Sequence, residues 1–161
     1  MTPNFPIISF HKNQFQIIQS EEYLSHTTIL ALSSPAEHID NYEIDSNLDK
    51  WKYGIDGSNH KLTAWKKFLA KTFYNPVVKV NIVWKKIGSS NIKALKENIY
   101  KCLEMDDDIL TQFIDAQTII KHLTSAQTFN DICDTINKFI FELDVEELYK
   151  EFDEDLEIRS Y

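Results

Sequence analysis

Each of the three tryptophans in the sequence is followed directly by a lysine, a pairing that could bind nucleic acid. The pairs are Trp51-Lys52, Trp65-Lys66 and Trp84-Lys85. Grooves for single-stranded nucleic acid combine aromatic rings, on which bases stack, with cations that contact the phosphates. Such a groove needs the ring and the cation on one surface. The directions of the tryptophan and lysine side chains therefore decide whether these pairs can form one.

The periods of helices and strands separate each ring from its lysine. Residues 62–73 carry apolar side chains at helical spacing, with Trp65 on the apolar side and the lysines on the other. Trp51 and Trp84 fall in alternating, strand-like stretches, where neighbouring side chains point to opposite faces. We therefore interpret the rings as buried core anchors beneath a lysine-bearing surface.

Acids, histidines and cysteines are the other groups whose spacing could support chemistry. The run 106–108 is Asp-Asp-Asp, but the glycine and distal glutamate of a calcium loop do not follow it, and carboxylates at this position favour helix capping. No histidine pairs with another histidine or a cysteine at zinc spacing; the five are His11, His26, His38, His60 and His122. No glycine-rich phosphate loop and no GxSxG elbow occurs.

From these patterns we expect no metal, no cofactor and no enzymatic activity. The sequence does not exclude a catalytic nucleophile and base that only the fold brings together, because such partners need not be adjacent in sequence. Cys102 and Cys133 lie among apolar residues at helical spacing. They are too few for a disulfide scaffold, so buried, reduced thiols are predicted.

Composition is typical of one globular protein domain. The chain has 161 residues, of which 43% are apolar and 12% aromatic, with only 3 glycines and 4 prolines. No apolar run reaches the roughly 18 residues that a membrane span requires. The first fifteen residues, MTPNFPIISFHKNQF, lack a basic start and a long apolar segment. We therefore expect a cytoplasmic protein.

Charge is strongly segregated along the chain. The net charge of −8 divides into −6 over residues 1–49, +10 over 50–96 and −12 over 97–161. Two explanations of this segregation are possible: the basic and acidic blocks neutralise each other, or they capture a partner of opposite charge. All but one of the seventeen basic residues are lysines, which cannot make the two-pronged contacts that read bases.

The first half of the chain predicts strands and one helix. Turn residues between alternating apolar stretches predict two hairpins, and proline or polar residues bound the remaining segments. The expected elements are the hairpins 6–10/15–18 and 42–45/50–53, a strand at 27–32, the helix 62–73 and a strand at 77–85.

The second half predicts helices that begin at capping residues. These are a helix from Ser90 to about Met105, one capped by Asp108 and reaching Leu123, one opened by a Thr128–Asp131 capping box, and a short helix 145–152. Strands followed by helices indicate an α+β fold, in which an N-terminal antiparallel sheet of hairpins is covered by C-terminal helices. We expect a single domain over 1–161, with 1–88 mainly strands and 89–155 helical.

This organisation resembles the bacterial immunity proteins of contact-dependent growth inhibition and other polymorphic toxin systems. The stretches that carry the resemblance are FPIISFHKNQFQIIQSEEYL, YEIDSNLDKWKYG and the acidic C-terminal helices. The likeness is one of general organisation rather than of a diagnostic motif. It implies a protein-binding inhibitor that neutralises a cognate toxin, often a basic nuclease, by covering its active site with an acidic surface.

The resemblance places the partner-binding surface on acidic side chains of the second half, and it implies a basic protein partner, without membrane or nucleic acid. The candidate residues are Glu104, Asp106, Asp107, Asp108, Asp144, Glu146, Glu147, Glu151, Asp153, Glu154 and Asp155. One alternative is a nucleic-acid-binding module that uses the lysine-rich block 50–96, through Lys52, Lys66, Lys67, Lys71, Lys79, Lys85 and Lys86. The other is an enzyme with a site that the sequence does not display.

Overall fold

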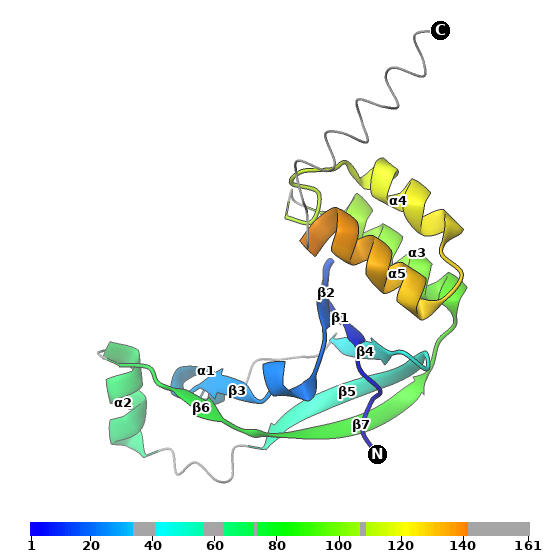
Figure 1. Ribbon diagram of the computed structural model, residues 1–161. Helices are drawn as coiled ribbons and strands as arrows, with labels where there is room; N and C mark the ends of the chain where they lie inside the picture. The colour runs from blue at the N-terminus through cyan, green and yellow to red at the C-terminus, as the bar shows by residue number, and fades with distance from the viewer. Residues whose placement is uncertain (34–40, 57–62, 73, 107–108, 142–161) are drawn as a thin grey trace, which may run out of the picture. The chain divides into compact units, whose positions relative to one another are not determined.

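The chain forms two compact units, each with its own packed interior (Figure 1). Unit 1 spans residues 1–91 and contains the strands, and unit 2 begins at Ile92 and is helical where it is described. The α+β class, with an N-terminal antiparallel sheet followed by helices, is confirmed. The coverage of the sheet by helices and the single domain remain predictions. The computed structural model describes residues 1–33, 41–56, 63–72, 74–106 and 109–141.

Unit 1 is built on a five-stranded antiparallel sheet in the order β2-β1-β4-β5-β7. Both predicted hairpins are present, as β1–β2 and β4–β5. Lys12 and Leu48 take positive φ values of 53° and 63° in the turns of these hairpins. The strands are β1 (Ile7–His11), β2 (Gln14–Ile18), β4 (Tyr42–Asp45), β5 (Asp49–Asp56) and β7 (Asn81–Ser89).

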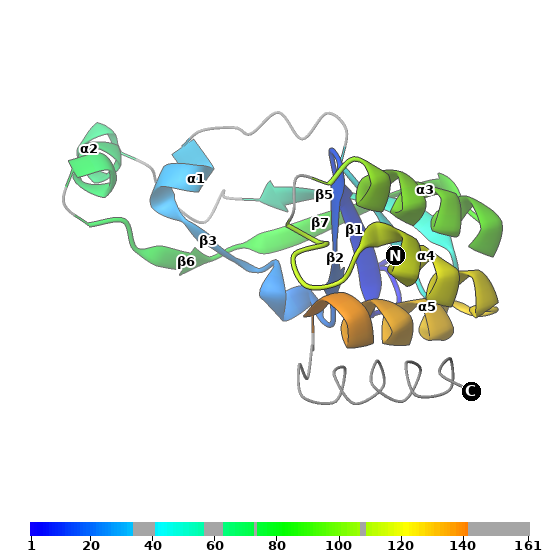
Figure 2. The ribbon, with the colours of Figure 1, turned by 90° about the horizontal axis from the view of Figure 1, so that it is seen from above.

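A second, two-stranded sheet in unit 1 pairs β3 with β6. Figure 2 shows that β6 leads directly into β7 and that α1 and α2 lie beside this small sheet. These elements are β3 (His26–Thr28), β6 (Val77–Lys79), α1 (Ile29–Ser33), α2 (Ala64–Thr72) and the 3-10 turn η1 (Glu21–Tyr23).

The single strand predicted over 27–32 is wrong, because the chain turns into helix α1 after Thr28. The Thr28 hydroxyl accepts a hydrogen bond from Ala31 N at 3.2 Å, as a helix-capping side chain does. Asn75 Oδ1 accepts from Leu30 N at 3.0 Å, which satisfies a second amide of the first turn. The sequence Leu-Ala-Leu then follows its high helix propensity.

The single strand predicted over 77–85 is two strands that belong to different sheets. Val80 separates them, and its side chain is buried. Its amide donates to the Ser25 carbonyl at 2.8 Å, one position beyond the His26–Lys79 pair of the β3–β6 sheet. The apolar alternation continues through the break, which explains why the sequence did not reveal it.

Unit 2 packs helices α3 (Ile92–Glu104), α4 (Ala116–Ser125) and α5 (Phe129–Ile136), followed by a π-helical turn, η2 (Asn137–Phe141). Their buried residues recur at the predicted helical spacing: Leu95, Ile99, Leu103, Ile119, Leu123, Ile132 and Ile136. The predicted helix 145–152 lies outside the described residues. Within the described ranges, no helix combines the length and the hydropathy needed to cross a bilayer.

The predicted caps of unit 2 differ in their outcome. The Thr128–Asp131 capping box is confirmed, with both reciprocal hydrogen bonds formed. Ser90 does not cap α3, because its hydroxyl makes no hydrogen bond and the helix begins two residues later, at Ile92. The helix expected from residue 109 begins only at Ala116, where Asp115 is the cap and accepts from Thr118 N at 3.0 Å.

Removal of the α5 cap should destabilise unit 2. We expect Thr128→Ala to lower its free energy of unfolding by about 1 kcal/mol, because the amide of Asp131 loses its acceptor. The matched control is Thr124→Ala, whose hydroxyl only donates to a carbonyl of its own helix and which should stay within about 0.5 kcal/mol of the parent protein. Urea unfolding followed by far-UV circular dichroism measures both, and equal effects would refute the assignment.

Candidate functional site

Residues 105–106 and 109–115 of unit 2, named here the Asp106 loop, are non-helical and are linked to one another by one carboxylate. Asp106 Oδ2 accepts hydrogen bonds from Leu110 N at 2.8 Å, Thr111 N at 2.9 Å and Thr111 Oγ1 at 2.8 Å. Leu110 and Ile114 anchor the loop, since both side chains are buried. These contacts explain why α4 starts late: the amides that would continue a helix are bound to a side chain instead.

The anchoring of the Asp106 loop leaves three large apolar side chains in solvent. Met105 is 58% exposed, Ile109 is 60% and Phe113 is 65%. The helix expected from Asp108 to Leu123 would have carried Ile109 and Phe113 on its apolar face, and their exposure shows that this expectation is wrong for both residues. Exposed apolar groups beside acidic residues are typical of a protein-binding surface rather than of a solvated face.

The acidic residues predicted to bind a partner are only partly within the described chain. Glu104 is exposed at the end of α3, next to Met105. Asp106 is half-buried, and its Oδ2 is used for the loop contacts described above. The others lie outside the described residues, namely Asp107, Asp108, Asp144, Glu146, Glu147, Glu151, Asp153, Glu154 and Asp155.

The three tryptophans have three different environments. Trp51 is buried, as predicted, with 4% of its surface exposed. Trp84 is half-buried: its ring packs against Tyr53 with centroids 5.5 Å apart, and its Nε1 donates to Glu21 Oε2 at 2.7 Å. Trp65 is 65% exposed and stacks on Phe68, which is 50% exposed. The prediction of a buried ring is therefore wrong for Trp65.

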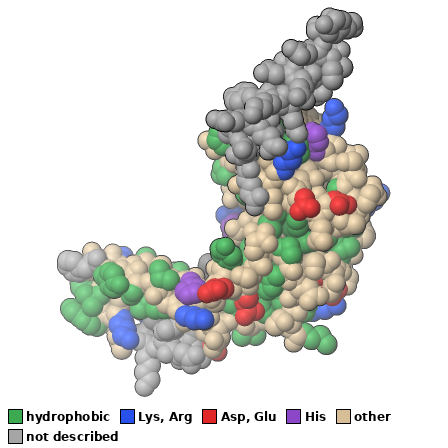
Figure 3. Space-filling model, viewed as in Figure 1, with side chains coloured by type: hydrophobic (Ala, Val, Ile, Leu, Met, Phe, Trp, Pro, Cys, Tyr) green, Lys and Arg blue, Asp and Glu red, His purple; other side chains and the backbone are tan. Residues whose placement is uncertain are grey.

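Helix α2 exposes its rings because it is buried along a different stripe from the one predicted. Ala70 is buried and Leu69 half-buried, and the helix packs on α1. The predicted stripe was centred on Trp65 and also included Phe68, Leu69 and residues 62 and 73, the last two of which lie outside the described chain; of its described members only Leu69 is half-buried. Figure 3 shows hydrophobic side chains gathered at the surface in the part of unit 1 that carries α2.

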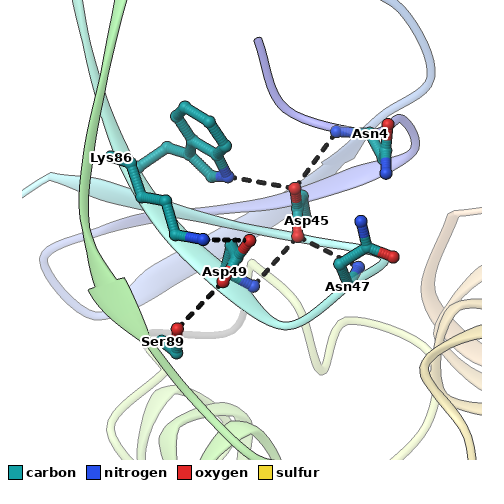
Figure 4. A network of polar contacts seen from close by, with 7 residues as sticks. Asn4, Asp45, Asn47, Asp49, Lys86 and Ser89 are labelled. Carbon is teal, nitrogen blue, oxygen red and sulfur yellow. Dashed lines mark hydrogen bonds and ion pairs between the residues drawn. The ribbon is translucent and has the colours of Figure 1, made fainter. Parts of the chain in front are cut away.

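A buried carboxylate, Asp45, organises the turn between β4 and β5 (Figure 4). Its Oδ2 accepts from the Trp51 indole at 3.0 Å and from Asn4 N at 3.1 Å. Its Oδ1 accepts from Asn47 N at 3.0 Å and Asp49 N at 2.9 Å. With these partners the group serves the fold and is not arranged for catalysis.

Asp49, in the same turn, ties β5 to the neighbouring strand β7. Its carboxylate accepts from the Lys86 ammonium and from Ser89 Oγ. These hydrogen bonds hold the pKa of Asp49 below its usual range. Lys86 is one of the lysines assigned to the alternative nucleic-acid module, and its ammonium group is held here by Asp49.

Glu43 on β4 is the most unusual titratable group among the described residues. It is 1% exposed, and Ser9 Oγ donates to its Oε1 across a long 3.4 Å. Its Oε2 has no hydrogen-bond partner within the described chain. It borders a cavity of about 20 Å³ with Asn41, Lys52 and Tyr53, space for about one water molecule. Burial raises the pKa of Glu43 to about 7, against the smaller opposing effects of Ser9 and Lys52.

Cysteines and histidines form no metal centre in the described chain. Cys102 and Cys133 are buried and free, in agreement with the prediction for these thiols. Burial raises the pKa of both, and that of Cys133 to about 12. His122 stacks on Phe139 with centroids 4.4 Å apart, a packing contact. No cluster of three or more His, Cys, Asp or Glu side chains occurs in the parts that the structure describes.

No protein-family model, curated protein or solved structure matches this chain. Functional assignment therefore depends on the contacts of its own residues. Exposed large apolar side chains lie next to charged residues at several places in the described parts of the chain, among them the Asp106 loop in unit 2 and helix α2 in unit 1.

The buried Glu43 should make unit 1 less stable as the pH rises. The folded carboxyl holds its proton more tightly than the unfolded one, so stability is full below pH 4.5, falls between 4.5 and about 7, and is then constant. The loss is on the order of 3 kcal/mol. In Glu43→Gln this decline should be absent. Urea unfolding followed by tryptophan fluorescence tests this, since all three tryptophans lie in unit 1.

The matched control for Glu43 is Glu97→Gln, because Glu97 is an exposed glutamate of α3. The control should leave the pH profile unchanged. A free-energy difference between Glu43→Gln and the parent protein that is the same at pH 4 and pH 8 would contradict the assignment.

The buried thiols should resist alkylation in the folded protein. Because the thiolate is the reactive form, a pKa of about 12 leaves Cys133 almost wholly protonated at neutral pH. We expect iodoacetamide to modify neither cysteine in the native protein and both in denaturant, as measured by intact mass. Rapid modification of the native protein would show that the helices of unit 2 open readily.

Proposed function

We propose that the chain is a protein-binding inhibitor of the immunity type, which neutralises a basic toxin by occupying its surface. The observation that supports this most directly is the Asp106 loop. A loop that presents Met105, Ile109 and Phe113 to solvent has the form of an interface centre, where a few buried apolar anchors supply most of the binding energy.

The exposed Glu104 and the acidic composition of the second half of the sequence give the proposal its partner class. Glu104 adjoins the loop, and residues 97–161 carry a net charge of −12. Carboxylates at the rim of an interface accelerate encounter with a basic protein and disfavour acidic partners. Neutralisation by occupying the toxin requires no chemistry from this chain, so its titratable groups are free to serve the fold, as Asp45 and Asp106 do.

The proposal is tested by isolating the partner and measuring its affinity. The purified chain is immobilised, and a lysate of the source organism is passed over it at low salt. The retained protein is expected to be basic, and its affinity should fall as salt rises. Inhibition is then measured directly, as loss of the partner's activity with one equivalent of the chain. Failure to retain a basic protein would overturn the proposal.

A pair of phenylalanine variants locates the surface. Phe113→Ala should weaken partner binding about 30-fold, the effect of losing about 2 kcal/mol at an interface centre. The matched control is Phe68→Ala, an exposed phenylalanine of unit 1, which should bind the partner normally. Titration calorimetry measures both. If Phe113→Ala binds like the parent protein, the Asp106 loop is not the contact.

A further inference from the structure

We propose that the exposed face of helix α2 binds single-stranded nucleic acid, through base stacking on the Trp65–Phe68 pair and phosphate contacts from Lys67 and Lys71. This surface is separate from the Asp106 loop and goes beyond the inhibitor function. Its residues come from one nine-residue helix, so their mutual arrangement is set by helix geometry.

The two rings and the ammonium groups of Lys71 and Lys67 follow one another around the exposed arc of α2. With Trp65 at 0° and a turn of about 100° per residue, Phe68 lies at about −60°, Lys71 at about −120° and Lys67 at about −160°. All four side chains are exposed. The buried Ala70 lies at about 140° and the half-buried Leu69 at about 40°, with the exposed Lys66 between them at about 100°.

This arrangement reverses the inference from the sequence. A ring directed into the core would point away from the lysines of its helix and could not serve in a stacking groove. Because α2 is buried through Ala70, the rings of Trp65 and Phe68 are exposed, and the exposed Lys71 lies about 60° from Phe68. A stacking ring and an ammonium group are thus neighbours on one surface, as a groove that binds bases and phosphates requires.

The two rings already form the type of contact that a base would extend. Trp65 and Phe68 stack with their centroids 5.7 Å apart and their planes 22° from parallel. Each ring remains at least half exposed, so the pair offers π surface for further stacking. The start of α2 is fixed by Thr63, whose hydroxyl accepts from Lys66 N at 3.3 Å.

Charge determines which partner this surface fits. The sequence from Gly57 to Lys96 contains nine lysines and no acid, so the segment attracts anions. Lysine binds phosphate as a point charge and does not read bases, which indicates tolerance of sequence. Unpaired bases are free to stack, whereas those of a duplex are already stacked, so the single strand is the form that fits.

A lipid surface fits the same helix less well. Interfacial helices bury a continuous apolar face, with cations kept to the polar side. In α2 the exposed apolar arc is narrow, because the rings at about 0° and −60° are flanked by the exposed Lys66 at about 100° and Lys71 at about −120°. Anionic vesicles are therefore the competing occupant to include in the test.

Binding is measured by the anisotropy of a labelled oligothymidylate of about 20 nucleotides, in about 20 mM salt, where phosphate contacts are strongest. We expect saturable binding that weakens with salt and is tighter than binding to a duplex of the same length. Trp65→Ala should weaken it about tenfold, and Trp65→Phe should restore most of the loss because it keeps a stacking ring. Lys67→Ala with Lys71→Ala should reduce the slope of log affinity against log salt by about 1.4.

Matched controls distinguish binding at α2 from the nonspecific effect of removing any exposed ring or any exposed lysine. Tyr23→Ala removes an exposed ring outside α2, and Lys101→Ala removes an exposed lysine of unit 2; both should bind like the parent chain. Phe113→Ala should also bind the oligonucleotide normally, so this test and the partner test fail independently. Circular dichroism confirms that each variant is folded, as expected for substitutions of exposed side chains.

Four results would overturn the proposal. The first is that the oligonucleotide does not bind at low salt, and the second is that duplex and single strand bind with equal affinity. The third is that Trp65→Ala and Tyr23→Ala bind the oligonucleotide equally well. The fourth is that the chain binds anionic phosphatidylserine vesicles but not the oligonucleotide. The last result would assign the same residues to a lipid surface.

Discussion

The carboxylate of Asp45 holds together three parts of unit 1. It joins the N-terminal segment at Asn4, the turn that follows β4 and the indole of Trp51 on β5, and it is almost fully buried. A buried charge is tolerated only when hydrogen bonds replace its hydration, and four donors do so here. The register of the β4–β5 hairpin, and with it the central sheet, depends on this contact.

Local patterns predicted those parts of the fold that local interactions determine. The hairpins and the helix opened by Thr128 were predictable because their signals, alternation and a reciprocal cap, act over a few residues. The strand expected at 27–32 failed because Asn75, far along the chain, satisfies an amide of α1. Val80 could not be identified as a break, since its amide partner, Ser25, is equally remote in sequence.

The candidate surfaces were missed by the sequence for a related reason. Apolar residues at helical spacing indicate a buried face, but they do not tell which of two possible stripes meets the rest of the protein. Trp65 and Phe113 carry the strongest apolar signals of their segments, and both face solvent. Smaller residues, Ala70 and Leu110, are buried in their place. The conflict between the apolar pattern and the observed burial makes these residues candidates for a binding surface.

Strand β7 ends the order of the described strands, and this position has a consequence for how copies of the protein behave in concentrated solution. It is nine residues long and exposes Val83 and Ile87, the composition of an edge that recruits strands from other chains. Lys85 and Lys86 lie between these two residues and are exposed. The ammonium of Lys86 is bound to Asp49 of β5, whereas Lys85 places an exposed charge on the edge. Lysine on an edge strand is one of the features that disfavour edge-to-edge pairing of sheets.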